Sequence, residues 1–218
     1  MLFTDVVIEQ GREALGPSAR RSVTAVVLAA GLSRRMGREN KLLLPISGEP
    51  LIRFVVRAAL QARCQRVLVV LGHEAPGVRE ALVDLPVECV FNEAFEEGIG
   101  SSVRVGANAV SDQDAVVFCL ADMPNIRANV IDQLIDAFEA NPDFVGFQAC
   151  YGGKRGNPVL WAPSCLPRLR ESAGDEGARP LLRKYSETVM LVNVGESSVI
   201  DDIDTPEDYS RVSNGVTP

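Results

Sequence analysis

The stretch from Val23 to Lys41 constrains the fold of this chain most, because an apolar run passes there directly into a small, basic loop. The run from Val23 to Leu28 is rich in β-branched residues and predicts a buried strand. It is followed by Ala29, Ala30 and Gly31, and then by several cationic side chains. A glycine-containing turn after a parallel strand lets backbone N–H groups approach an anion closely. The stretch therefore indicates a phosphate-binding loop.

The uneven charge of the chain agrees with this interpretation. The 218 residues carry a net charge of −7 at pH 7. Residues 31–41 hold four cations, Arg34, Arg35, Arg38 and Lys41, against one acid, so this loop is +3 and the remainder is −10. An acidic protein is not expected to bind nucleic acid or an anionic membrane, whereas one basic loop favours a small anionic ligand.

Residue usage narrows the class of protein further. The five cysteines are widely spaced and form no C-x-x-C pair, so we expect reduced thiols and a cytoplasmic location. No apolar run reaches about 18 residues, so we expect no transmembrane helix and no membrane partner. His73 is the only histidine, which excludes a histidine-rich metal site.

Hydrophobic patterns predict one α/β domain over residues 23–212, after a flexible extension at 1–22 and before a loose tail at 213–218. Apolar runs predict further strands at 66–71, 87–91, 115–120, 144–150, 157–161 and 189–194. Helical spacing predicts helices at 51–62, 77–83, 103–110 and 128–140, a short helix ending at 185, and a terminal helix opening at Thr205-Pro206. Pro50 suits the first position of the helix at 51–62, and a glycine-serine turn suits the cap of the helix at 103–110.

Alternating strands and helices predict a doubly wound, mostly parallel, Rossmann-like sheet. The last third differs, since the Gly152-Gly153 turn between two strands predicts a hairpin and hence a mixed C-terminal excursion. In parallel sheets, ligands bind beyond the carboxyl ends of the strands. Both Gly31 and Asp122 fall at such ends.

The basic loop departs from the two commonest phosphate motifs. Five residues separate Gly31 from Gly37, and Arg38-Glu39 follows, so the loop is not a Walker A motif; nor does it contain G-x-G-x-x-G. It reads A-A-G-x-S-x-R-M-G-x-x-x-K, which closely resembles the signature loop of the MobA-like nucleotidyltransferases. This family includes the molybdenum-cofactor cytidylyl- and guanylyltransferases and is related to sugar-phosphate pyrophosphorylases. The resemblance extends from Val23 to Val212 and implies a nucleotide-diphospho-sugar transferase-like fold.

The resemblance implies a nucleotide site in the loop and in a second glycine-serine element. Backbone amides around Ala30 to Ser33 would hold the β- and γ-phosphates, while Arg35 and Lys41 would neutralise charge on the departing pyrophosphate and act as the catalytic residues. The implied nucleotide-binding residues are Leu28, Ala29, Ala30, Gly31 and Ser33, with Gly100, Ser101 and Ser102 from the element Gly98 to Ser102.

Two acidic segments are the candidates for a metal site. Asp122 follows the buried run 115–120, and a carboxylate there can hold Mg²⁺ against a triphosphate. Thr205-Pro206 with the acids after it is explained as a helix cap, but the acids before it are not. The resemblance implies that one of them completes the metal site, with Asp202 as first choice and Asp204 as second.

The resemblance to the cytidylyltransferase (MocA-like) branch rests on Ala-Ala-Gly in the loop and on Gly174-Asp-Glu-Gly-Ala-Arg179. It implies that Asn157, Pro158, Asp175 and Arg179 face the acceptor. The implied reaction is Mg²⁺-dependent transfer of a nucleoside monophosphate from an NTP, CTP being favoured, to the phosphate of molybdopterin cofactor, a phosphorylated pterin, with release of pyrophosphate.

Three alternatives stay open at the level of sequence. The donor is GTP, or the acceptor is a sugar phosphate or another phosphorylated alcohol, or the chain is a non-catalytic carrier of nucleotide or cofactor. A molybdoenzyme or its chaperone is the protein partner that the resemblance suggests.

Overall fold

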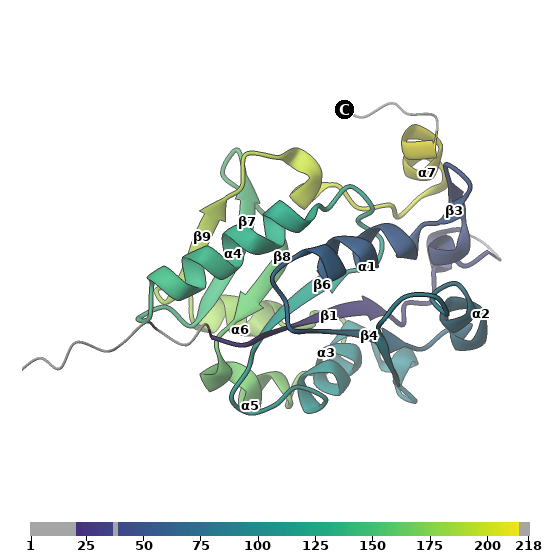
Figure 1. Ribbon diagram of the computed structural model, residues 1–218. Helices are drawn as coiled ribbons and strands as arrows, with labels where there is room; N and C mark the ends of the chain where they lie inside the picture. Colours follow the sequence, from purple (N-terminus) through teal and green to yellow (C-terminus); the bar gives the residue numbers. More distant parts are fainter. Residues whose placement is uncertain (1–20, 37–38, 214–218) are drawn as a thin grey trace, which may run out of the picture.

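The computed structural model describes residues 21–36 and 39–213 (Figure 1). Of the predicted extension at 1–22, only residues 21 and 22 are described. Gly37, Arg38 and the tail after Ser213 also lie outside the described residues.

A seven-stranded sheet forms the centre of the molecule, with strand order β5-β4-β1-β6-β8-β7-β9. The strands are β1 (Val23–Ala29), β4 (Arg66–Leu71), β5 (Glu88–Phe91), β6 (Ala115–Leu120), β7 (Gly146–Tyr151), β8 (Lys154–Trp161) and β9 (Val189–Asn193). β1 pairs in parallel with β4 and β6, and β4 pairs in parallel with β5. The predicted mostly parallel α/β sheet is confirmed.

The C-terminal part of the sheet is mixed, as the glycine turn predicts. β7 and β8 form an antiparallel hairpin, and β8 returns into the sheet to pair antiparallel with β6. β9 then adds to the far side of β7 in parallel. The hairpin therefore enlarges the sheet beside β6, where the motif at Asp122 leaves the strand.

Helices cover both faces of the sheet (Figure 1). α1 (Ile52–Gln61) and α4 (Ala128–Ala140) pack on one face, and α3 (Ile99–Asn108), α5 (Leu166–Leu169) and α6 (Arg179–Lys184) pack on the other. Alternate residues of a strand point to opposite faces, so Val27 belongs to the first core and Val26 to the second. This double burial explains why the β1 sequence is apolar without alternation.

Several element boundaries differ from the sequence predictions. Pro50 is not at the start of a helix: it lies in β3 (Glu49–Pro50), which pairs with β2 (Pro45–Ile46), and α1 begins at Ile52. The turn between β2 and β3 has positive φ at both of its residues, 47 and 48, so the chain closes a hairpin before the helix can start. The predicted helix at 77–83 is α2 (Ala75–Glu80).

The glycine-serine turn does supply the N-cap, Gly98, but the helix predicted at 103–110 begins earlier than expected. α3 begins at Ile99 behind Gly98, and no side chain caps it; Ser101 and Ser102 lie inside its first turn and are buried. The terminal helix, α7 (Pro206–Ser213), does begin as predicted. No helix in the described part of the chain is both long and apolar enough to cross a membrane.

Candidate functional site

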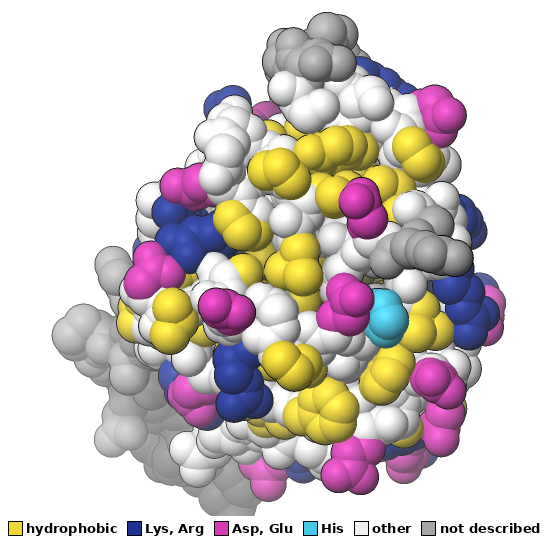
Figure 2. All heavy atoms as spheres, turned by 90° about the vertical axis from the view of Figure 1, so that its right-hand side faces the viewer, with side chains coloured by type: hydrophobic (Ala, Val, Ile, Leu, Met, Phe, Trp, Pro, Cys, Tyr) yellow, Lys and Arg dark blue, Asp and Glu magenta, His cyan; other side chains and the backbone are white. Residues whose placement is uncertain are grey.

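A cleft of about 550 Å³ lies at the carboxyl ends of β1 and β6, and we call it the main cleft. Figure 2 looks onto the side of the molecule that is on the right in Figure 1, where hydrophobic side chains gather among scattered acidic and basic groups. The wall of the main cleft contains Leu28, Ala30, Gly31, Leu32, Ser33, Arg34, Arg35, Lys41, Phe95, Glu96, Glu97, Gly98, Ile99, Ser102, Leu120, Asp122, Asp175, Asp202 and Asp204.

The basic loop folds back on itself so that its last residue returns to its start. Ser33 has a φ of 50°, and its Oγ accepts a hydrogen bond of 3.3 Å from the Lys41 backbone N–H. Asn40 is buried, and its Oδ1 accepts from the Leu42 N–H at 3.1 Å, which begins the 3₁₀ turn η2 (Lys41–Leu43). These two bonds explain the spacing between Ser33 and Lys41, because they set Lys41 beside the carboxyl end of β1.

Lys41 points into the main cleft and donates three hydrogen bonds. Its Nζ lies 2.7 Å from Asp122 Oδ2, 2.7 Å from the Ile203 carbonyl oxygen and 2.8 Å from Asp204 Oδ1. Burial lowers the pKa of the Lys41 ammonium, but Asp122 and Asp204 outweigh burial and raise that pKa above its ordinary value. Lys41 is therefore a fixed cation at neutral pH.

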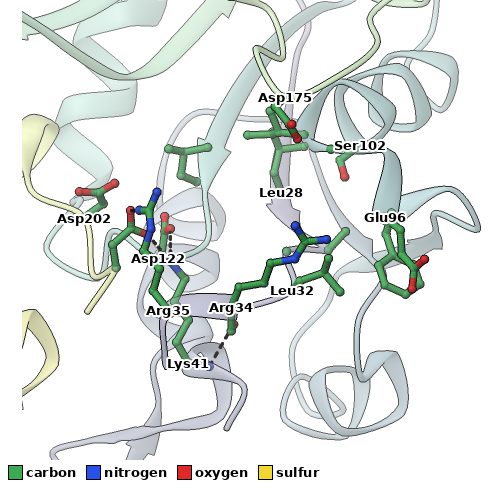
Figure 3. A pocket seen from close by; sticks show the side chains of 18 of the residues that line it. Leu28, Leu32, Arg34, Arg35, Lys41, Glu96, Ser102, Asp122, Asp175 and Asp202 are labelled. Carbon is green, nitrogen blue, oxygen red and sulfur yellow. Dashed lines mark hydrogen bonds and ion pairs between the residues drawn. The ribbon is translucent and has the colours of Figure 1, made fainter. Parts of the chain in front are cut away.

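Arg35 approaches the same carboxylates from the cleft mouth. Its Nη1 donates to Asp204 Oδ2 at 2.5 Å, although 72% of the Arg35 side chain is exposed. Figure 3 shows Arg35, Lys41 and Asp122 close together, with Asp202 beside them, whereas Arg34 reaches in another direction, toward Leu32. We call the group Arg35, Lys41, Asp122, Asp202 and Asp204 the cation–carboxylate cluster.

Three carboxylates of this cluster can hold a divalent metal ion. One oxygen from each of Asp122, Asp202 and Asp204 lies within 4.8 Å of the others. Asp122 Oδ1 is buried and has no hydrogen-bond partner in the described part of the chain, which suits a ligand that is not a protein group. Although Asp202 is exposed, partial desolvation within the cluster, and then repulsion from Asp122 and Asp204, raise the pKa of Asp202. A cation between the three would relieve that repulsion.

The segment with Asp202 and Asp204 is held in place at both ends. The Ile203 backbone N–H donates to the Asp122 carbonyl oxygen at 3.0 Å, which joins two segments about eighty residues apart in the chain. After Asp204, Thr205 Oγ1 accepts from the Asp208 N–H at 3.2 Å while Asp208 Oδ2 accepts from the Thr205 N–H at 3.0 Å. This reciprocal cap at the start of α7 confirms the helix cap predicted at Thr205-Pro206.

A smaller cavity of about 160 Å³ adjoins the main cleft, and we call it the side cavity. The two share Leu28, Ile99, Leu120 and Asp175. Apolar side chains form most of the side-cavity wall, among them Val103, Phe118, Val159, Trp161 and Leu182. The charged and amide side chains in this wall are Asn157, Asp175, Glu176 and Arg179.

Two glycines of the Gly98-to-Ser102 element bring the loop with Asp175 against α3. A Cβ on Gly100 would lie 2.3 Å from the Ala173 backbone carbon, and one on Gly98 would lie 2.3 Å from Asp175 Oδ1. The Gly100 N–H donates to the Gly174 carbonyl oxygen at 2.8 Å. These glycines therefore serve a close backbone contact at the junction of the two cavities.

The structure brings most of the predicted site residues together. In the main cleft lie Leu28, Ala30, Gly31, Ser33, Arg35, Lys41, Ser102, Asp122, Asp175, Asp202 and Asp204, and in the side cavity lie Asn157 and Arg179. Ala29, Gly100, Ser101 and Pro158 are buried behind these walls and line neither cavity. Asn92 Nδ2 donates to the hydroxyls of Ser101 and Ser102, which explains their burial.

The sequence interpretation missed one wall of the main cleft. Leu32, Arg34, Phe95, Glu96, Glu97, Gly98, Ile99 and Leu120 were not among the predicted site residues. The available signal was position, because residues 95–98 directly precede the glycine-serine element. Trp161 and Phe147 are fully buried in the core, and Trp161 also borders the side cavity.

Comparisons with known proteins agree with this geometry. Residues 25–189 match the MobA-like NTP transferase domain. The chain is 29% identical to nicotine blue oxidoreductase of Paenarthrobacter nicotinovorans, over 91% of this chain and 100% of that protein. It is 31% identical to the purine catabolism protein PucB of Bacillus subtilis, over 88% and 96% of the two chains.

Solved structures are similar over most of the fold. Rv0371c from Mycobacterium tuberculosis aligns with a TM-score of 0.79 at 28% identity, covering 89% of this chain and 98% of that one. A complex of Rv0371c with manganese aligns at 0.75 and 26%, covering 89% and 100%. A nucleotidyl transferase from Methanothermobacter, Mth528, aligns at 0.77 and 25%, covering 89% and 97%.

Proposed function

The chain belongs to the MobA-like NTP transferase family and is a nucleotidyltransferase, and from this premise we propose that it transfers CMP from CTP to the phosphate of molybdopterin cofactor, with Mg²⁺ bound and pyrophosphate released. The observation that carries the proposal is the cation–carboxylate cluster. It combines fixed cations, which suit a triphosphate, with three carboxylates, which suit a divalent ion.

Asp122, Asp202 and Asp204 would hold the Mg²⁺, and the existence of a manganese complex of the similar protein Rv0371c supports a divalent ion. When bound, the ion would neutralise charge on the triphosphate and polarise its phosphorus–oxygen bonds. The unpartnered oxygen Asp122 Oδ1 supports Asp122 as the principal ligand.

The chain's own residues would supply position and charge. Backbone N–H groups between Ala30 and Ser33 would bind the β- and γ-phosphates. Lys41 and Arg35 would neutralise the negative charge that develops on the leaving pyrophosphate. No nucleophile from the protein is needed, since a phosphate oxygen of the acceptor attacks the α-phosphorus in line and the cleft holds the two substrates together.

The side cavity supports an acceptor that carries a flat ring. An apolar cavity of about 150 Å³ holds a benzene ring, so a space of about 160 Å³ accommodates one ring of a fused system. A pterin presents flat ring faces that can pack against these apolar walls, while its polar atoms lie along the ring edge and need partners among the few polar groups of the cavity. Arg179 and Asn157, at this cavity, can bind a phosphate and a heterocycle edge respectively.

The donor base rests on family associations alone. Ala-Ala-Gly in the loop and the Gly174-to-Arg179 element point to the cytidylyl branch. We further propose one nucleotidyltransferase domain over residues 23–212, acting in the cytoplasm and delivering its product to a molybdoenzyme or that enzyme's chaperone. The free thiols of all five cysteines support the reducing compartment.

The decisive experiment measures pyrophosphate release from each of the four NTPs with Mg²⁺, in the presence of molybdopterin cofactor, of a sugar phosphate, or of neither. We expect release with CTP that requires the pterin. Release with GTP would identify GTP as the donor in place of CTP. Release with a sugar phosphate would identify that compound as the acceptor in place of the pterin. Binding of nucleotide and pterin without any release would support the carrier. A parallel assay that follows oxidation or reduction of nicotine blue tests the activity in the name of the Paenarthrobacter relative.

A further inference from the structure

Lys41 has no hydrogen-bond donor left for a phosphate in this arrangement. An ammonium carries three N–H donors, and those of Lys41 point to Asp122 Oδ2, the Ile203 carbonyl oxygen and Asp204 Oδ1 at 2.7–2.8 Å. Only 13% of the Lys41 side chain is exposed. The residue expected to bind the triphosphate is therefore fully engaged with two carboxylates and one backbone carbonyl.

The same contacts occupy three of the six carboxylate oxygens that Asp122, Asp202 and Asp204 offer to a metal ion. Asp204 has both carboxylate oxygens in hydrogen bonds with cations, Oδ1 with Lys41 and Oδ2 with Arg35. Asp122 has Oδ2 in such a bond, and only its Oδ1 is without a partner in the described part of the chain. A divalent ion entering this cluster must displace an ammonium or lie beside it, and like charges a few ångströms apart repel.

We propose that Lys41 and Arg35 are internal counter-ions that close the metal site, and that the triphosphate opens it by drawing them away. This inference rests on the NTP site of the proposed function. Phosphate oxygens offer the two side chains new charge-assisted hydrogen bonds. These bonds offset the free energy lost when Lys41 and Arg35 leave the carboxylates. Metal binding then depends on nucleotide, and by linkage the metal strengthens nucleotide binding by the same factor.

Arg34 provides a matched control within the same loop. It carries the same charge one residue before Arg35, and it also lines the main cleft. Its side chain extends away from the carboxylates (Figure 3), and none of its hydrogen bonds or ion pairs within residues 21–36 and 39–213 reaches them. Removing Arg34 changes the net charge of the loop without opening the cluster.

The test measures Mn²⁺ binding to the full chain without nucleotide, by electron paramagnetic resonance or calorimetry, for the wild type and for Lys41→Met, Arg35→Met and Arg34→Met. We expect Lys41→Met to bind Mn²⁺ about tenfold more tightly than the wild type, because a charge-assisted competitor is gone. Arg35→Met should gain less, about threefold, since its side chain is exposed. The Mn²⁺ affinity of Arg34→Met should stay within about twofold of the wild-type affinity.

A second arm adds saturating CTP and corrects for the Mn²⁺ that CTP binds in solution. The difference between the wild type and Lys41→Met should then shrink, because CTP has already drawn the ammonium away. The proposal fails if Lys41→Met binds Mn²⁺ no more tightly than the wild type, or if Arg34→Met gains as much as Lys41→Met, which would indicate net charge alone.

Two controls separate the change in Mn²⁺ affinity from effects on folding and on catalysis. Circular dichroism shows whether Lys41→Met is folded, and Arg35→Met, at an exposed side chain, tests the same idea if it is not. The measurement of Mn²⁺ binding without nucleotide requires neither catalytic turnover nor a particular nucleotide base. Absence of pyrophosphate release from every NTP would overturn the proposed function while the Mn²⁺ affinities still decide the inference.

Discussion

The cation–carboxylate cluster and the polar groups of the side cavity are built in opposite ways. Within the cluster, side chains hold one another through hydrogen bonds of 2.5–2.8 Å. At the side cavity, no side-chain hydrogen bond or ion pair within residues 21–36 and 39–213 engages Asn157, Asp175 or Arg179. The cations and carboxylates of the cluster are thus paired with one another, whereas these three side chains are free to take partners from a ligand.

The difference between the two sites arises from the strands that carry them. The parallel strands β1 and β6 end side by side, so the loop after β1 and Asp122 after β6 meet. The side cavity depends instead on β8, which runs antiparallel, and on the loop before α6. Our proposal therefore assigns the triphosphate and metal chemistry to the parallel part of the sheet and acceptor selection to the mixed part.

The largest expected effect comes from breaking the cluster at Asp122. Asp122→Asn keeps the shape but removes a charge that the metal and Lys41 both need. We expect pyrophosphate release to fall at least about a thousandfold, since metal stabilisation of the transition state is worth several kcal/mol. Steady-state kinetics measure this, with circular dichroism as the folding control. Turnover within tenfold of the wild type would remove Asp122 from the site.

The contact between α3 and the loop with Asp175 links the two cavities, and Gly100→Ala would strain it. The new Cβ would lie 2.3 Å from the Ala173 backbone carbon, which cannot rotate away. We expect a loss of about 2 kcal/mol in unfolding free energy and a higher acceptor KM, because the loop must shift. Chemical denaturation and acceptor titrations measure the two effects.

Gly77→Ala in α2 is the matched control for Gly100→Ala. Its Cβ would lie 3.1 Å from Leu43 Cδ1, the end of a flexible side chain, and alanine favours a helix over glycine by about 1 kcal/mol. This variant should be as stable as the wild type or slightly more stable. Equal destabilisation by both substitutions would show that helix context, and not the contact with Ala173, decides the outcome.

A smaller effect tests the free side chains of the side cavity. Arg179→Ala should raise the acceptor KM about tenfold, because it removes one charged hydrogen-bond donor, and should leave the CTP KM unchanged. Arg183→Ala is the control, since Arg183 lies one turn later in α6 and pairs with Glu176. If Arg179→Ala changed the CTP KM instead, the residue would belong to the nucleotide site.

The comparison also explains how much could be predicted from the sequence. The strand before Gly31 and the strand before Asp122 were predicted because double burial makes both runs continuously apolar. Lys41, Asp122 and the acids before Thr205 were predicted because they fall in motifs whose order resembles a family. The choice between Asp202 and Asp204 as the second candidate metal ligand did not have to be made, because both carboxylates lie with Asp122 in one cluster.

What could not be predicted depends on non-local packing. No local pattern shows that β8 pairs with β6, so the side cavity beside Trp161 was not foreseen. Phe95 and Glu96 gave no periodic signal, yet they reach the main cleft because the 95–97 turn precedes α3 there. Pro50 suited a helix start by composition, but a two-residue turn placed it in a hairpin.

The smallest expected effect concerns the charge of Asp202 in the protein without metal. Partial desolvation within the cluster, followed by repulsion from Asp122 and Asp204, raises the pKa of Asp202 above its unfolded value. The folded state therefore binds the proton more tightly, so the ionised carboxylate costs stability at every pH above the folded pKa, and this cost disappears as the pH falls below the unfolded value of about 4. Asp202→Asn should accordingly raise the melting temperature slightly at pH 7 with EDTA present.

The pH dependence separates this effect from a general gain in packing. The difference in melting temperature between Asp202→Asn and the wild type should shrink as the pH falls from 7 to 4, because the wild-type carboxylate becomes neutral as well. Saturating Mn²⁺ should reverse the order at pH 7, since the ion stabilises only the protein that keeps all three carboxylates. A stabilisation that is independent of both pH and metal would mean that Asp202 is an ordinary surface acid, and the cluster would then hold its metal through Asp122 and Asp204 alone.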